Sequence, residues 1–311
     1  MNQTSKLIIY HYVRPIKNSK YPKIKGIELE GFVKQLEYFK NNFNFITSGD
    51  FLNCIYADKI LPQHSILLTF DDGLKDHYLH VFPILKKLKI YGMFFPSAQA
   101  IEDNHVLDVH KIHFVLAQTD NKKKIIDDIF YLINEYRDQY NLNTTKSYYD
   151  SLAVPNRFDD KDTIFIKRIL QHGLPRNLRS MIVNSLFKEF VTNDEKSFAK
   201  DLYLSYEEIH EMREYGMYFG SHGYSHEWLG TISPSELNFE IEESRKFYSR
   251  INGNNDHMIM CYPYGSYSAE VIQKLKESEY KVGLTIEVGD AVLNKLNAFT
   301  LKRYDTNDFQ Q

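Results

Sequence analysis

Short apolar runs alternate with amphipathic helical patterns over the first hundred residues of this 311-residue chain. The runs at 7–12, 65–70 and 91–95 have the length of buried strands. Between them, the segments 28–41 and 76–89 place apolar residues three and four positions apart, as on one face of a helix. This alternation predicts parallel strands joined by helices, which is the construction of a (β/α) barrel.

The same alternation returns from residue 201 onward and ends in a predicted last strand at 299–304. Residues 101–200 instead show long helical patterns, with apolar residues every three to four positions. This stretch is too long for a loop, so we expect a helical insertion that forms a lid or a substrate-selecting wall. The expected organisation is a barrel of residues 1–100 and 201–311 with an insertion at 101–200.

Two adjacent carboxylates, Asp71 and Asp72, stand where an apolar run ends in a turn at Gly73. Barrel enzymes carry their catalytic residues at such strand ends. Where a strand bends into a glycine, the alternation of side chains relaxes, so both carboxylates can reach one site. One can then bind a metal while the other transfers protons. Taken alone, Asp-Asp-Gly is more often an ordinary turn.

His222 and His226 are four residues apart, the spacing that places two histidines on one helical face. Together with one aspartate they form a set of two histidines and one carboxylate. Three protein ligands leave room for water and substrate, which is typical of a catalytic rather than a structural metal site. A third fragment, Tyr262–Gly265, reads Tyr-Pro-Tyr-Gly and also follows an apolar run.

These three fragments, in this order, resemble the polysaccharide deacetylase family, whose members remove N- or O-acetyl groups from sugars with a divalent metal. The resemblance covers residues 7–100 and about 201–305. It implies an α/β fold with a distorted, incomplete (β/α) barrel. It also implies that Asp72, His222 and His226 bind the metal, with Zn²⁺ as the default and Co²⁺, Ni²⁺, Mn²⁺ or Fe²⁺ as alternatives.

The resemblance further implies that Asp71 is the general base and that the Tyr264 backbone N–H stabilises the tetrahedral intermediate. Both roles fit the chemistry. A divalent ion lowers the pKa of its water towards about 7 and polarises the acyl oxygen, so a nearby carboxylate suffices as base. Tyr262, Tyr224 and Trp228 are the residues that we expect to contact the substrate.

Two positions depart from the family pattern. Many members have Arg two residues before the proline of the third fragment, where it orients the base, but this chain has Cys261. Arg303 is the nearest replacement, and a bidentate contact would keep Asp71 ionised. Many members also carry a catalytic His near the C-terminal end, whereas residues 281–311 contain none. His11, after the first strand, is either the general acid, a substrate contact or a structural neighbour.

Composition fits an enzyme that has no nucleic-acid partner and no membrane span. Lys and Arg number 38 against 41 Asp and Glu, and no basic patch indicates nucleic-acid binding. No apolar run is long enough to span a membrane, and because no long apolar segment precedes the first strand we expect no signal peptide. The two cysteines, Cys54 and Cys261, fit a reducing compartment. We therefore expect a cytoplasmic enzyme that acts on a nucleotide- or lipid-linked sugar precursor.

The expected reaction is hydrolysis of an acetamide on an amino sugar. A sugar O-acetyl ester or an N-formyl amide is the nearest alternative, because the machinery acts on the carbonyl. A sugar-binding or scaffold protein that has lost catalysis is the alternative from another class. The two departures favour it, whereas the presence of all three ligand candidates and of the base argues against it. His110 and His113 lack a third ligand, so we expect a solvent-facing pair or a lid contact rather than a second metal site.

Overall fold

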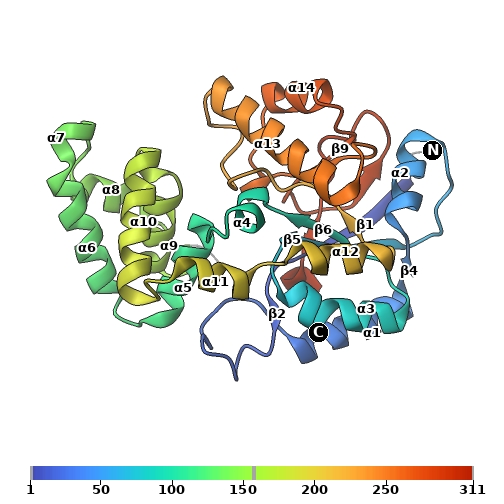
Figure 1. Ribbon diagram of the computed structural model, residues 1–311, viewed down its shortest axis with the longest axis horizontal. Coiled ribbons are helices and arrows are strands. Elements are labelled where there is room, and N and C mark those ends of the chain that lie inside the picture. Colours follow the sequence, from blue (N-terminus) through green and yellow to red (C-terminus); the bar gives the residue numbers. More distant parts are fainter. Residues whose placement is uncertain (1–2, 156–158, 310–311) are drawn as a thin grey trace. The chain divides into compact units, whose positions relative to one another are not determined.

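The computed structural model describes residues 3–155 and 159–309, which form two compact units. The first unit comprises residues up to 15, 26–105 and 199 onward, and it contains the described strands (Figure 1). The second unit comprises residues 16–25 and 106–198 and is helical. Residues 16–25, which the sequence analysis assigned to the barrel, thus group with the helical unit.

The first unit is built on a mostly parallel sheet. Its central strand, β5 (Ser65–Asp72), is buried at every position and pairs in parallel with β1 and β6. Such burial on both faces explains the continuous apolar run. The sheet consists, in the described residues, of β10 (Ala291–Leu293), β1 (Gln3–Tyr10), β5, β6 (Met93–Pro96) and β7 (Tyr218–Phe219), with β11 (Tyr304–Asp305) beside β1 and β4 (Asn44–Phe45) beside β5.

The barrel is incomplete because its remaining strands pair separately. Among the described residues, β8 (Ile259–Cys261) pairs with β9 (Val282–Leu284), and single bridges join Ser221 to Met260 of β8 and Leu301 to Leu284 of β9. A further short pair is formed by β2 (Val13–Arg14) and β3 (Ile27–Glu28). The predicted last strand, 299–304, is reduced to the bridge at Leu301 and the start of β11. The prediction of an α/β fold with a distorted, incomplete barrel is confirmed.

Helices connect the strands, and several begin with a capping box. In Figure 1, α1 and α3 lie on one side of the sheet and α13 and α14 on the other. Ser205 with Glu208 caps α12, and Ser233 with Glu236 caps α13, which satisfies the first backbone N–H groups. The helices of this unit are α1 (Leu29–Asn42), α2 (Ser48–Tyr56), a π-helical turn (His77–Val81), α3 (Phe82–Leu88), α4 (Ala98–Glu102), α12 (Tyr206–Glu214), α13 (Pro234–Asn252) and α14 (Ala269–Glu277), with 3-10 turns at Pro263–Gly265 and Thr306–Phe309.

Strand alternation determines which side chains of β5 face the barrel interior. Leu67 belongs to the core cluster that joins β1, β5, β6, β8 and β9. Phe70 points to the opposite face, where it stacks on Tyr10 of β1 and Phe94 of β6 at ring distances of 5.1 and 4.7 Å. Because side chains two residues apart share a face, Asp71 lies on the same side as Leu67, at the C-terminal end of the strand.

The second unit packs its own apolar core, to which Phe114, Ile129 and Phe165 belong. Tyr21, from the segment 16–25, packs its ring 4.8 Å from that of Phe114. The helices are α5 (Asp108–Gln118), α6 (Lys122–Glu135), α7 (Arg137–Tyr140), α8 (Thr145–Leu152), α9 (Lys161–Arg168), a π-helical turn (Ile169–Gly173) and α10 (Arg176–Phe190), with α11 (Glu195–Leu202) crossing the boundary at residue 198.

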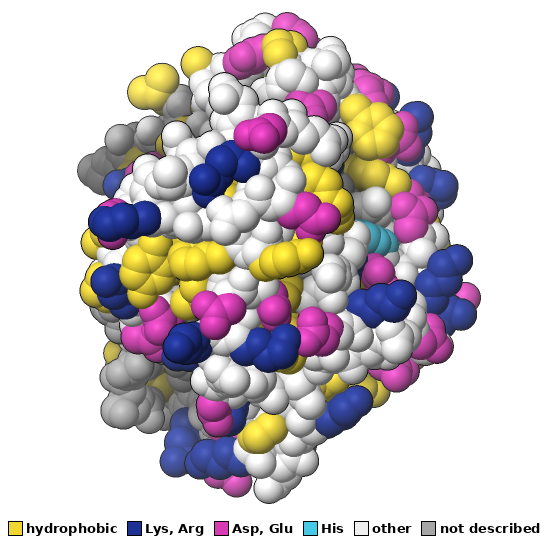
Figure 2. Space-filling model, turned by 90° about the vertical axis from the view of Figure 1, so that its left-hand side faces the viewer, with side chains coloured by type: hydrophobic (Ala, Val, Ile, Leu, Met, Phe, Trp, Pro, Cys, Tyr) yellow, Lys and Arg dark blue, Asp and Glu magenta, His cyan; other side chains and the backbone are white. Residues whose placement is uncertain are grey.

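Hydrophobic side chains form a band across the face shown in Figure 2, with charged side chains on both sides of it. Among the described residues of the helical unit, Tyr131, Val154 and Met181 are the large hydrophobic residues that are exposed. The role of this unit as a lid or wall stays a prediction. Among the described helices, none has both the length and the apolar character that crossing a membrane requires.

Candidate metal and catalytic site

Three of the predicted ligands converge on one buried point. The Nε2 atoms of His222 and His226 lie 3.3 and 3.4 Å from the same atom, Oδ1 of Asp72. One ligand atom from each of the three residues lies within 4.8 Å of the others. Two imidazole nitrogens and one carboxylate oxygen, so close together, match the donor set of a three-ligand catalytic metal site.

The backbone at the end of β5 explains why both carboxylates reach this region. Asp72 and Gly73 have φ values of +73° and +68°, in the left-handed region. This turn departs from strand geometry, so the Asp72 side chain does not follow the alternation that directs Asp71. A Cβ at Gly73 would lie 2.6 Å from the Cβ of Pro96, so the turn requires glycine.

His222 and His226 lie in a loop after β7, not on the helical face that their spacing suggested. Gly223 and His226 have φ values of +72° and +61°, and this curvature brings the two imidazoles to a centroid distance of 4.8 Å. A left-handed conformation costs a non-glycine residue about 1–2 kcal/mol. Asp72 and His226, two of the three ligands, therefore store backbone strain, as is common at functional sites.

A hydrogen bond sets the orientation of His222. Its Nδ1 lies 2.7 Å from the backbone carbonyl oxygen of Cys261, so Nδ1–H is the donor and Nε2 carries the lone pair. Burial opposes protonation of this ring, but Cys261, Asp72 and Asp71 favour it and raise the pKa of His222 well above its ordinary value. In the metal-free protein, a proton therefore competes with the metal for Nε2.

Asp71 is held by Arg303, from the far end of the chain. The guanidinium Nη1 and Nη2 atoms each lie 2.9 Å from one oxygen of the carboxylate, and both side chains are buried. Burial alone would raise the pKa of Asp71, but the charge of Arg303 outweighs it and lowers this pKa to about 2. Arg303 thus occupies the orienting position that the sequence analysis assigned to it.

Arg303 is itself fixed by the barrel. Its Nε donates to the carbonyl of Thr285 at 2.8 Å, and its Nη1 also donates to Oγ1 of Thr69 at 3.0 Å. Cys261 completes the cluster, because its Sγ lies 3.0 Å from Nη2 of Arg303 and donates to Asp71 at 3.2 Å. Asp71 is therefore both ionised and held in one orientation.

A second set of ligand atoms overlaps the first, namely Asp71, His222 and Cys261. This set is the poorer metal site for two reasons. Both oxygens of Asp71 already accept hydrogen bonds from Arg303. Burial also raises the pKa of the Cys261 thiol, whereas a metal binds the thiolate. The set that contains Asp72 is the better candidate.

Tyr264 lies beside the candidate metal ligands. It occupies the 3-10 turn Pro263–Gly265 with φ +56°, and the turn is closed by Gly265 N–H donating to Tyr262 O at 2.9 Å. Its ring packs edge-on against His226 at 4.6 Å and stacks on Trp228 at 4.5 Å. The half-buried rings of Tyr264 and Trp228 therefore form an aromatic wall next to His226.

The two other residues predicted to contact substrate are engaged elsewhere. The side chain of Tyr262 is 0% exposed and its hydroxyl donates to Phe299 O at 3.0 Å, so the prediction of a substrate contact is wrong for it. Tyr224 is half-buried and its hydroxyl donates to Asp103 at 3.0 Å. The sequence signal failed at Tyr262 because an aromatic residue at a strand end serves packing as readily as recognition.

His11 is exposed at the end of β1, and its charge is one of those that lower the pKa of Asp71. A buried position in the core is thus excluded, and the roles of general acid, substrate contact and structural neighbour stay open. Asp76 is buried near the end of β1, where it accepts from the Val13 backbone N–H at 3.2 Å and from Arg14 Nε at 2.7 Å.

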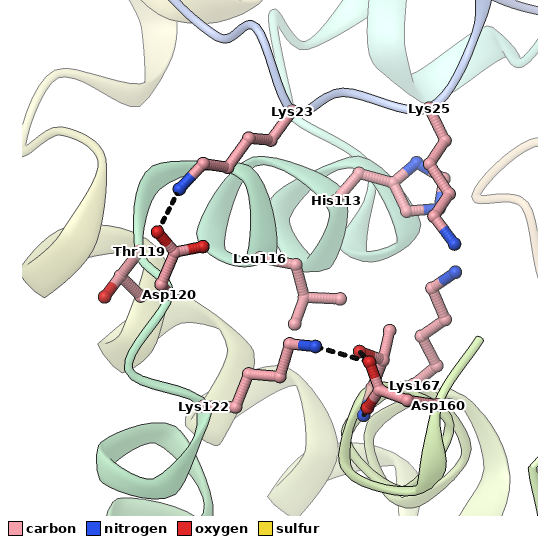
Figure 3. Close-up of a pocket in the computed structure, with 10 residues that line it drawn as sticks. Lys23, Lys25, His113, Leu116, Thr119, Asp120, Lys122, Asp160 and Lys167 are labelled. Atoms are coloured by element: carbon pink, nitrogen blue, oxygen red, sulfur yellow. Dashed lines mark hydrogen bonds and ion pairs between the residues drawn. The ribbon is translucent and has the colours of Figure 1, made fainter.

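The helical unit has a cavity of about 220 Å³, shown in Figure 3. Its lysines are paired with aspartates: Lys23 with Asp120, Lys122 with Asp160, and Lys25 and Lys167 both with Asp159. His113 lines this cavity, whereas His110 is fully buried, so a solvent-facing pair is wrong for His110. The groups of three metal-binding side chains found in the described residues all lie in the first unit.

Comparison with known proteins gives consistent matches. The sequence model of the family described as polysaccharide deacetylase matches residues 58–136 and 187–283. YxkH of Bacillus subtilis (strain 168), a curated protein, is 28% identical over 285 residues, which are 92% of this chain and 65% of YxkH. This chain therefore spans just under two thirds of the length of that relative.

Solved structures match the fold. The deacetylase PplD of Streptococcus pyogenes, in complex with acetate, has a TM-score of 0.60 at 16% identity, over 98% of this chain and 93% of PplD. A de-N-acetylase from Aggregatibacter actinomycetemcomitans has a TM-score of 0.53 at 15% identity, over 98% of this chain and 96% of the other. At these identities, the likeness establishes the fold.

Proposed function

Because this chain belongs to the polysaccharide deacetylase family, we propose that it is a metal-dependent hydrolase that removes an N-acetyl group from an amino sugar. Membership of this family supports a deacetylation of a carbohydrate. The observation that carries the proposal is the convergence of Asp72, His222 and His226 beside the ionised carboxylate of Asp71. The substrate that we propose is a glycan or its nucleotide- or lipid-linked precursor, and a cytoplasmic location stays a prediction.

The donor set fits a divalent ion. Asp72, His222 and His226 would hold it, and the contact of His222 Nδ1 with Cys261 O orients the first imidazole. Zn²⁺ is our first choice, and Co²⁺, Ni²⁺, Mn²⁺ or Fe²⁺ would also suit two nitrogens and one oxygen. When bound, the ion supplies Lewis-acid chemistry, activating water and polarising the acyl oxygen.

The remaining residues provide proton transfer and charge stabilisation. Asp71, held by Arg303, accepts a proton from the attacking water. The Tyr264 backbone N–H donates to the oxygen on which negative charge develops. His11 gives a proton to the leaving amine. The charge of Arg303 lowers the pKa of Asp71 to about 2, so this carboxylate is ionised at neutral pH and can accept a proton.

The alternatives are a sugar O-acetyl esterase, an N-formyl hydrolase and a binding or scaffold protein. The first two would use the same machinery on another acyl group. The scaffold hypothesis rested partly on the missing Arg of the third fragment. Arg303, which directly precedes β11, makes a bidentate contact with Asp71, and this weakens that argument.

The test is release of acetate and formate from N- and O-acylated sugars, nucleotide sugars and oligosaccharides. Apo protein and protein restored with each divalent metal are compared. We expect acetate release from an N-acetylated substrate only after metal is restored, with about one ion per chain. Stoichiometric metal binding without release from any substrate would favour the scaffold hypothesis.

Metal affinity is expected to rise with pH. The pKa of His222 is raised well above its ordinary value in the metal-free chain, so the proton must leave before Nε2 can bind an ion. If one proton is displaced, the dissociation constant falls about tenfold per pH unit below that pKa. Calorimetric titration in buffers of different ionisation enthalpy measures the released proton. An affinity that is constant between pH 6 and 8 would contradict this assignment.

His11→Ala is expected to retain the metal and to lower kcat, by about 10²–10⁴-fold if His11 is the general acid. The physical reason is that the leaving amine then departs without a positioned proton donor. His210→Ala is the matched control, because His210 is also exposed but lies on α12. The measurement is kcat of the two metal-loaded variants under steady-state conditions. If kcat of His11→Ala equals that of the unmodified chain, His11 is not the general acid.

A further inference from the structure

We propose that Glu240 is a positioning residue that holds the loop between His222 and His226 in its metal-binding conformation. Glu240 lies on α13, outside all three sequence fragments. The inference rests on the proposed metal site, because it assigns the support of one of its ligand loops. It concerns assembly of the site rather than contact with substrate.

The carboxylate of Glu240 is engaged by the loop itself. Its Oε2 accepts the backbone N–H groups of Tyr224 and Ser225 at 2.9 and 3.0 Å. Its Oε1 accepts the hydroxyl of Ser225. Glu240 is 1% exposed, and glutamate is almost never buried so completely unless its oxygens are satisfied. These hydrogen bonds explain why a glutamate can occupy this buried position on α13.

The carbonyl groups of the same loop accept hydrogen bonds from Ser97 and from the first residues of α4. Ser97 Oγ donates to His222 O at 2.9 Å. At the start of α4, Ala98 N–H donates to Gly223 O at 3.2 Å and Gln99 N–H donates to Tyr224 O at 2.9 Å. α4 therefore fixes the acceptors of the loop while Glu240 fixes its donors. Buried backbone groups require such partners, and here they come from two helices.

The loop needs this support because its conformation is not one that the chain prefers. Gly223 and His226 both have positive φ values, and His226 carries a Cβ that makes the left-handed region unfavourable. Without Glu240, the N–H groups of Tyr224 and Ser225 would lose their acceptors next to the ligand His226. The loop would then relax, and Nε2 of His226 would no longer be held 3.4 Å from Asp72 Oδ1.

The experiment measures the Zn²⁺ and Co²⁺ dissociation constants of the full chain and of its variants by calorimetry. Glu240→Ala is expected to weaken metal binding by about 10–100-fold, the usual effect of removing a partner that orients a metal ligand. Glu240→Gln is expected to recover most of this loss, because the amide oxygen can accept both N–H groups while its NH₂ donates to Ser225 Oγ. The Co²⁺ absorption spectrum reports whether the ligand geometry changes.

Glu208→Ala is the matched control, because Glu208 also accepts a backbone N–H, that of Ser205 at 2.8 Å, but in the capping box of α12. Its metal affinity should equal that of the unmodified chain. Ser225→Ala is a milder variant that stays informative if Glu240→Ala does not fold. It removes one of the three bonds and should weaken binding a few-fold.

The outcomes separate the two proposals. If the unmodified chain binds metal and Glu240→Ala and Ser225→Ala bind it equally well, the inference about Glu240 is wrong and the proposed function stands. An equal loss in Glu240→Ala and Glu208→Ala would also overturn the inference, because the effect would then be general destabilisation. If the unmodified chain binds no divalent metal, the proposed metal site itself fails and the inference fails with it.

Discussion

Asp72→Ala is expected to yield a protein that binds no divalent metal at the site and releases no acetate. Asp72 Oδ1 is the atom towards which both histidine Nε2 atoms point, at 3.3 and 3.4 Å. Without it, two ligands remain, and a catalytic site of this kind needs three. His226→Ala should have the same effect. Metal content after gel filtration and acetate release measure the two losses independently.

A second variant at Asp72 is needed because its backbone has a positive φ. Its φ of +73° suits Asp and Asn better than Ala, so Asp72→Ala adds strain to the loss of a ligand. Asp72→Asn keeps the shape and the turn while removing the charge, and it should also lose metal. Asp290→Asn, at an exposed carboxylate paired with Lys6, is the control and should keep both metal and turnover. Stoichiometric metal in Asp72→Ala would instead implicate the overlapping set of Asp71, His222 and Cys261.

Asp71→Asn is expected to retain the metal and to lose the rate, by about 10²–10⁴-fold in kcat. Asn cannot accept the proton that an ionised carboxylate accepts, while the three metal ligands are untouched. Metal content and kcat, measured on the same preparation, test both halves of the expectation. Full activity in Asp71→Asn would show that another group is the base.

The same variant should be less stable, because Arg303 is left as a buried charge without its counterion. Breaking a buried pair in this way costs about 3–5 kcal/mol in the free energy of unfolding. The double variant Asp71→Asn, Arg303→Met removes both charges and should recover part of that stability without recovering activity. Urea unfolding and kinetics together thus separate the structural role of the pair from its catalytic role.

The contribution of Asp71 to stability has a pH dependence that follows from its lowered pKa. The pKa of Asp71 is lowered to about 2, so the stability that its ionised form contributes is present above its ordinary pKa of 3.8. That contribution is lost as the pH falls towards 2. A decline of activity between pH 7 and 5 therefore reports protonation of a group other than Asp71.

Much of the candidate site could be predicted because its residues follow strand ends. The central strand β5 is recognisable from its apolar run, and Asp71 and Asp72 must emerge where it ends. The two histidines have the residue types and the spacing of metal ligands. Arg303 was expected as the replacement for the Arg that the family resemblance implies at position 261, and a cation beside Asp71 would keep that carboxylate ionised. For these residues, the order along the chain and the chemistry of the side chain are enough to predict a place in the site.

The errors have a common physical cause, which is packing between distant segments. Tyr262 is buried against Phe299 rather than facing a substrate, and residues 16–25 pack with helices more than 80 positions away. The histidine pair lies in a loop whose shape depends on bonds to α4 and to Glu240. No local sequence pattern predicts these contacts, because each contact depends on which segments pack together in the folded chain. The sequence thus specified the reactive groups, and packing between remote segments specified their orientation and support.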